Sequence, residues 1–148
     1  MAPSAAPLAV KSETAVPGMA PRAERIVCAV MAVLFSFSAA VQYNDPDPIR
    51  WAAIYLAAMA VCIGYVARPM PALPAVLVAV ASLGWALIWA PGAFGSLPSA
   101  GDVATDFKMM SPGVEEFREE LGLLIVVVTM AILAVRSRAR ARASRSST

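Results

Sequence analysis

The sequence contains no histidine and very little charge. Only 15% of its 148 residues are charged, where soluble domains have about 25%, and 59% are hydrophobic. Without histidine, the chain can form neither a histidine-ligated haem nor a histidine-based zinc site, and Ser–His catalysis is excluded. Acid–base or metal chemistry would have to use carboxylates, lysine, tyrosine or backbone oxygen. As metal ligands, oxygen atoms favour hard ions such as Mg²⁺, Ca²⁺ or Mn²⁺.

Cysteine is also scarce. Cys28 and Cys62 both fall within apolar runs, which favours small hydrophobic side chains in a membrane interior over a disulfide or a metal pair. The net charge of +2 is too small to indicate nucleic acid as a partner.

Four apolar segments account for the excess of hydrophobic residues. A helix needs about 20 apolar residues to cross a bilayer. The sequence therefore predicts an all-α integral membrane four-helix bundle, with spans at about 26–43, 49–67, 72–90 and 114–135. The fourth span begins before its uncharged part, because Pro112 suits the first helical position and the acids after it suit the positive end of the helix dipole. The long tail before the first span argues against a cleaved secretory signal.

The two tails predict the orientation of the chain. Residues 1–25 are rich in Ala and Pro and residues 136–148 are rich in Arg, so both are predicted to be disordered cytoplasmic tails. Four spans place both termini and the 68–71 link on one side of the membrane. That side holds nine of the 12 Lys and Arg residues, and the other side holds Arg50, Lys108 and Arg118. This asymmetry predicts cytoplasmic termini, and the composition resembles that of bacterial inner-membrane proteins.

Most acidic residues and all three tryptophans lie toward the opposite side of the membrane. Eight of the 10 Asp and Glu residues lie there. All three tryptophans, Trp51, Trp85 and Trp89, are also near that end of their helices, which predicts an aromatic belt at the membrane interface. Within the spans, the small residues Gly64, Ser82 and Gly84 are predicted to be close-contact points between helices.

Two motifs at this acidic end are candidate parts of one polar site. "NDPDP" (44–48) follows the first span and "EEFREE" (115–120) opens the last one. Four spans bring both motifs to the same side, and Gly122 leaves room beside Glu119 for another backbone or a ligand. The candidate binding residues are Gln42, Asn44, Asp45, Asp47, Glu115, Arg118 and Glu119. If a metal binds, its ligands are expected to be Asp45, Asp47 and Glu119, with Arg118 orienting the carboxylates.

A simpler interpretation of the same residues is structural. Asp47 before Pro48 is a competent helix cap, and Asn44 and Asp45 can close the first helix through side-chain to backbone hydrogen bonds. Arg50 and Arg118 then only pair with nearby carboxylates. Caps and turns require the same residue types as the proposed site, so the sequence leaves both interpretations open.

The segments "VQYNDPDPIRWAAIY" (41–55) and "EEFREELGL" (115–123) resemble the transmembrane protein 220 family of bacteria and animals. The resemblance covers residues 26–135 and rests mainly on Gln42 and the 44–48 motif. It implies a four-helix membrane protein and no settled activity.

The leading functional prediction is a non-enzymatic membrane protein whose acidic outer mouth binds a cation, a lipid headgroup or a partner. The expected surroundings are the lipid bilayer, with a partner membrane protein or a second copy as further possibilities. A small transporter or channel subunit is one alternative, although the inner halves of the spans lack charge. A membrane enzyme using a carboxylate and a bound metal is the other.

Overall fold

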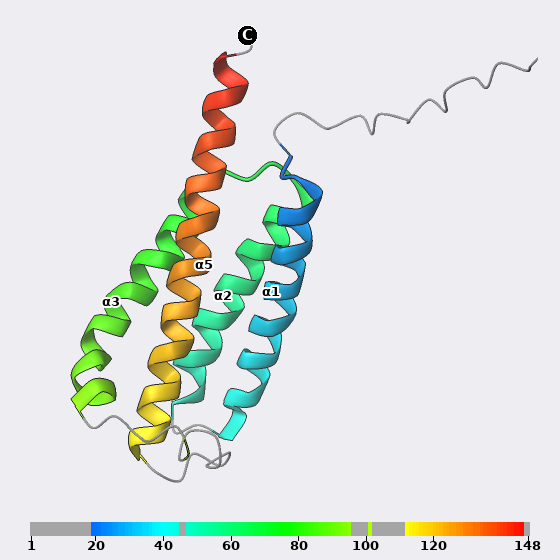
Figure 1. Cartoon of the computed structure of the whole chain (residues 1–148). Coiled ribbons are helices and arrows are strands. Elements are labelled where there is room, and N and C mark those ends of the chain that lie inside the picture. Colours follow the sequence, from blue (N-terminus) through cyan, green and yellow to red (C-terminus); the bar gives the residue numbers. More distant parts are fainter. Residues whose placement is uncertain (1–18, 45–46, 96–100, 102–111, 147–148) are drawn as a thin grey trace, which may run out of the picture.

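A computed structural model describes residues 19–44, 47–95, 101 and 112–146 of the chain. It contains four long helices joined in an up-and-down order (Figure 1). They are α1 (Arg22–Val41), α2 (Pro48–Ala67), α3 (Leu73–Gly95) and α5 (Pro112–Ser146), with the short 3₁₀ helix η1 (Gln42–Asn44) after α1. All four are long and apolar enough to cross a membrane. The described residues contain no strand, and the predicted all-α four-helix membrane fold is confirmed.

Prolines explain several helix boundaries. Pro48 and Pro112 each occupy the first position of a helix, where the missing N–H costs nothing. At the end of α2, Arg68 is extended (φ −156°, ψ 163°), as expected for a residue that precedes a proline. Pro91 is different, because α3 continues through it to Gly95 instead of ending at residue 90 as predicted. Pro91 lacks the N–H that would bond the carbonyl of Leu87, so one hydrogen bond is lost between residues 87 and 91, close to the end of the helix.

The last helix is longer than the sequence analysis predicted. Residues 136–146, expected to belong to a disordered tail, continue α5 to Ser146. This segment consists of Arg, Ala and Ser, and Arg and Ala are among the best helix formers. The hydroxyl groups of Ser144 and Ser146 donate to the carbonyls of Ala141 and Ala143, at 3.1 and 2.9 Å. The prediction of disorder for residues 1–18 lies outside the described residues.

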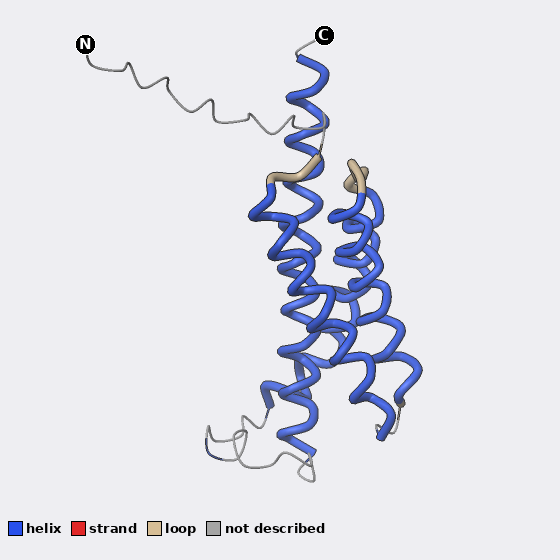
Figure 2. The backbone as a smooth tube through the Cα atoms, turned by 90° about the vertical axis from the view of Figure 1, so that its right-hand side faces the viewer, coloured by secondary structure: helices blue, strands red, loops and turns tan. Residues whose placement is uncertain are grey.

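The bundle is built from two helix pairs. α1 packs along α2, and α3 packs along α5, while the contacts of α2 with α3 and α5 are sparser. Figure 1 shows the first pair in blue to teal and the second in green and orange to red, and Figure 2 shows the same arrangement from the side. The start of α1, the end of α5 and the α2–α3 link lie at one end of the bundle, which we call the terminal end. The η1 turn and the start of α5 lie at the other, the loop end.

The core and the lipid-facing surface are both apolar. Large hydrophobic side chains such as Val33, Phe37 and Ile88 are exposed, as expected where the solvent is the bilayer. The buried core includes Tyr55, Tyr65, Leu123, Val126 and Met130.

Both cysteines are free and buried in this core. We expect neither thiol to react with a maleimide in minutes while the protein is folded, because reactivity requires an accessible thiolate. Both should react after unfolding in SDS. Mass spectrometry of the labelled chain measures this directly, and rapid labelling of the folded protein would contradict the packing of α1 against α2.

Candidate functional site

At the loop end, Asp47 is the N-cap residue of α2 and forms an ion pair with Arg50. The distance from Asp47 Oδ2 to Arg50 Nη1 is 2.8 Å, and the two side chains are 48% and 56% exposed. Exposed pairs of this kind add little stability. The Arg50 guanidinium also lies 5.9 Å from the centre of the Trp85 ring, a cation–π contact between α2 and α3. Asp47 thus occupies the predicted cap position, but its side chain makes no capping hydrogen bond to α2 and pairs with Arg50 instead.

The three tryptophans form a cluster between helices. The Trp51 ring lies 6.1 Å from the rings of both Trp85 and Trp89, and Trp51 is only 2% exposed. Their position at the loop end agrees with the sequence analysis. The predicted belt at the membrane interface is wrong for Trp51, because its ring is buried against α3. The cluster therefore joins the two helix pairs at the loop end.

The acids of the second motif have different surroundings. The Glu116 carboxylate lies against Gly92 of α3, where an added Cβ would be 2.8 Å from Glu116 Oε2. Arg118 and Glu119 are partly buried. Glu120 is 2% exposed, and its Oε2 has no hydrogen-bond partner among the described residues. Such an atom is rare in native proteins, so Glu120 is the most unusual acid of the described chain.

A contact of Tyr55 with Gly122 joins α2 to α5 two residues after Glu120. The Tyr55 hydroxyl occupies the position where a side chain at residue 122 would start. The space beside Gly122, predicted to admit a backbone or a ligand, is filled by a side chain of α2. Gly84, in contrast, has open space around it: nothing lies within 4 Å of a Cβ added at this position. The prediction that Gly84 is a close-contact point is wrong.

The structure locates the predicted site residues only in part. Gln42 is partly buried in η1, and Asp47, Arg118 and Glu119 are at the same end of the bundle. Asp45 and the side chains of Asn44 and Glu115 lie outside the described residues. In the part of the chain that is described, no group of three or more acids or cysteines is placed to hold a metal ion. The ligand set Asp45, Asp47 and Glu119 stays a prediction.

A polar cluster that the sequence pattern did not predict lies at the terminal end. Glu24 Oε2 accepts hydrogen bonds from the Tyr65 hydroxyl at 2.8 Å and from Arg140 Nη1 at 2.9 Å. Arg136 Nη1 lies 3.5 Å from Glu24 Oε1. We call Glu24, Tyr65, Arg136 and Arg140 the terminal clamp, because they tie α1, α2 and α5 together. Arg25 adds a further link, donating from Nε to the carbonyl of Val66 at 3.1 Å.

One feature of the sequence points to this cluster. Arg136 and Arg140 are four residues apart, so they share a face of α5 if the helix continues past the span. All three charged residues, Glu24, Arg136 and Arg140, fall in segments predicted to be disordered tails, and the structure places them in α1 and α5.

Comparison with known proteins identifies the family. The sequence model of Transmembrane family 220 matches residues 34–135, more than half of the chain. The chain belongs to Transmembrane family 220. No curated protein and no solved structure matches it. The family match contains both loop-end motifs and Tyr65, whereas Glu24, Arg136 and Arg140 lie outside the matched residues.

Proposed function

We propose that this family 220 protein is a non-catalytic, multi-pass membrane protein that binds a small cation at the loop end. Glu120 would be the buried ligand. Its position in a transmembrane helix, with the side chain directed into the bundle, is typical of a functional ionisable group.

The Oε2 atom of Glu120, which has no hydrogen-bond partner in the described part of the chain, carries this proposal. A buried carboxylate without a hydrogen-bond partner is unfavourable by several kcal/mol, on the order of 2–7 kcal/mol for an unpaired polar group. A bound cation removes that cost by supplying the missing electrostatic partner. Carboxylate oxygens select hard ions, so Mg²⁺, Ca²⁺ and Mn²⁺ are the candidates. Asp47 and Glu119 lie at the same end of the bundle and would provide further oxygens, with Asp45, outside the described residues, as a third candidate.

The orientation of the protein is part of the proposal. The two tails and the 68–71 link contain nine of the 12 Lys and Arg residues of the sequence, which supports cytoplasmic termini and a loop end on the outer side. A bacterial inner membrane is the proposed location. The acidic end would then meet cations from outside the cell.

Thermal stability in detergent tests the cation site. A ligand that binds only the folded protein stabilises it by about 2.7 kcal/mol at a hundred times its dissociation constant. We expect Mg²⁺, Ca²⁺ or Mn²⁺ to raise the melting temperature and a chelator to reverse the rise. Glu120→Gln should abolish the shift, and Asp47→Asn and Glu119→Gln should reduce it.

The control is the same substitution at the other end of the bundle. Glu24→Gln removes a carboxylate that already has arginine and tyrosine partners, so the cation-induced shift should persist whatever its effect on stability. Equal shifts in the wild type and Glu120→Gln, or none in the wild type with any ion, would contradict the proposed site.

A further inference from the structure

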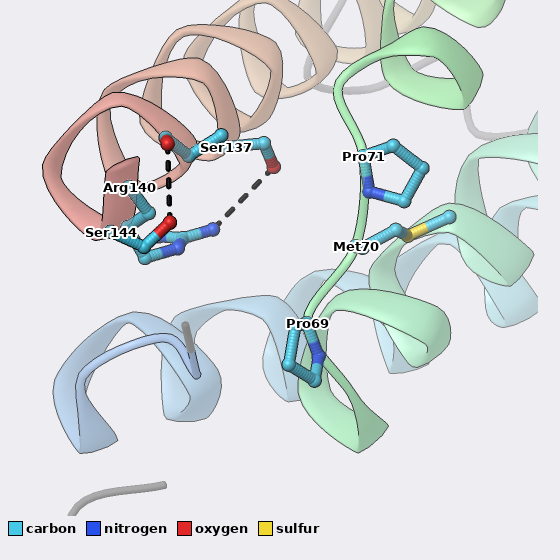
Figure 3. A pocket seen from close by; sticks show the side chains of 7 residues that line it. Pro69, Met70, Pro71, Ser137, Arg140 and Ser144 are labelled. Atoms are coloured by element: carbon cyan, nitrogen blue, oxygen red, sulfur yellow. Dashed lines mark hydrogen bonds between the residues drawn. The ribbon is translucent and has the colours of Figure 1, made fainter. Parts of the chain in front are cut away.

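A pocket of about 230 Å³ opens at the terminal end, between the α2–α3 link and the last turns of α5. Figure 3 shows Pro69, Met70 and Pro71 on one side of it and α5 on the other. Its polar lining comes from Ser137, Arg140 and Ser144. We propose that this pocket binds the phosphate group of an anionic phospholipid headgroup.

Arg140 is held in place before any ligand arrives. Its Nη1 donates to Glu24 at 2.9 Å and to the Tyr65 hydroxyl at 2.6 Å. Its guanidinium carbon lies 4.5 Å from the centre of the Tyr65 ring, and the side chain is only 20% exposed. An arginine fixed in this way loses little entropy when it binds an anion.

The other edge of the same guanidinium faces the serine side of the pocket. Arg140 Nη2 lies 3.5 Å from Ser137 Oγ, a long contact that Figure 3 marks with a dashed line. A planar guanidinium binds phosphate oxygens through its N–H groups in a fixed geometry. Nη2 can therefore donate to a phosphate oxygen while Nη1 remains hydrogen-bonded to Glu24. The Ser137 hydroxyl is close enough to donate to the same phosphate group.

The charge around the pocket favours an anion. Glu24 is the single carboxylate of the terminal clamp and is shared by Arg136 and Arg140, at 3.5 and 2.9 Å. One positive charge is left over in the clamp, and Arg68 precedes the Pro69–Pro71 wall. An anionic ligand balances this excess, whereas a cationic one would be repelled.

The level of the pocket favours a lipid as the source of the phosphate. The uncharged stretch of α5 ends at Val135, and Ser137 and Arg140 follow within two turns, where the headgroups of a bilayer begin. Leu73 and Leu77 open α3 directly after the link and are exposed. They offer an apolar surface for acyl chains beside the pocket. Inorganic phosphate would use only the arginine edge and the serine hydroxyl.

Binding of short-chain lipids in a non-ionic detergent tests the proposal. The probes are dioctanoyl phosphatidylglycerol, dioctanoyl phosphatidylcholine and inorganic phosphate, and the measured quantity is the dissociation constant. We expect phosphatidylglycerol to bind tightest. Phosphatidylcholine should bind roughly tenfold more weakly, because its positively charged ammonium group is repelled by the same arginines. Inorganic phosphate should be weaker than phosphatidylglycerol, since it has no acyl chains to contact α3.

Two serines provide a matched pair of variants. Ser144 lines the pocket one turn after Arg140, whereas Ser146 does not line it, and both hydroxyls donate to a carbonyl of their own helix. In Ser144→Glu, the new carboxylate can occupy the Nη2 edge of Arg140 at (i, i+4) spacing. Phosphatidylglycerol affinity should fall roughly tenfold to a hundredfold, the range of a hydrogen bond to a charged group. Ser146→Glu adds the same charge and should change the affinity by less than about threefold.

Three results would overturn the proposal. Equal losses in Ser144→Glu and Ser146→Glu would mean that the lipid only senses the general charge of α5. Binding of inorganic phosphate as tight as that of phosphatidylglycerol would make the pocket a site for free anions. No binding of phosphatidylglycerol would remove the site altogether. If Ser144→Glu does not fold, Ser137→Ala is the second variant. It leaves the contacts of Glu24 intact and should weaken binding severalfold.

Discussion

Replacing Glu24 with alanine should lower the free energy of unfolding by about 2–3 kcal/mol. The substitution removes the acceptor that Tyr65, Arg136 and Arg140 share. Removing one partner of a buried ion pair costs about 3–5 kcal/mol. The effect here is placed below that range because the Glu24 and Arg140 side chains are 25% and 20% exposed. Unfolding in mixed micelles with increasing SDS measures the change.

A double-mutant cycle shows whether this loss belongs to the terminal clamp. Glu24→Ala and Arg140→Ala should together cost less than the sum of the single losses by about 1–3 kcal/mol, because the second substitution removes a contact already broken. Arg142→Ala is the control, since Arg142 is exposed on the same helix and should change stability by less than about 0.5 kcal/mol. A loss for Glu24→Ala no larger than that of Arg142→Ala would show that the clamp does not tie the helix pairs together.

Gly122→Ala should lower stability by about 1–3 kcal/mol, the usual effect of overpacking a tight contact. The added methyl group collides with the Tyr55 hydroxyl, and Tyr55 is itself buried, so its ring has little space to move. Gly84→Ala introduces the same methyl group where nothing lies within 4 Å and should leave stability unchanged. Melting of the two purified variants provides the comparison.

Removing the Tyr55 hydroxyl tests the cause of this effect. In a Tyr55→Phe background, the nearest remaining ring atom is 3.3 Å from the new methyl group, so Gly122→Ala should cost less than it does in the wild type. An undiminished cost would mean that the contact between Tyr55 and Gly122 is not what limits this position.

The sequence predicted the four spans because bilayer thickness sets their length and charge marks their ends. The two helices that begin at Pro48 and Pro112 start one and two residues before the spans predicted from about 49 and 114. The packing was harder to predict for a physical reason. In a membrane, residues facing lipid are as apolar as residues facing the core, so hydrophobic periodicity does not reveal which face meets a neighbouring helix. This explains why Trp51 and Gly84 were assigned to the wrong surroundings.

The candidate site illustrates the same limit. The number and order of the membrane spans were enough to predict that the 44–48 and 115–120 motifs lie on the same side of the membrane. The order of the spans does not show which of Glu119 and Glu120 faces the interior of the bundle, because the two side chains point about 100° apart around the helix. That choice depends on the register of α5 against α3, which is seen in the contact of Glu116 with Gly92. Glu24 was missed because its partners are on α2 and α5, distant in sequence and brought to it only by the fold.

The most direct test of the cation site is Mn²⁺ binding followed by electron paramagnetic resonance of the purified protein. The wild type and Glu24→Gln should each bind roughly one Mn²⁺ per chain through oxygen ligands, and Glu120→Gln should bind none. Either equal binding by wild type and Glu120→Gln, or no bound Mn²⁺ in the wild type together with no change on adding Mg²⁺ or Ca²⁺, would contradict the assignment of Glu120 as a cation ligand.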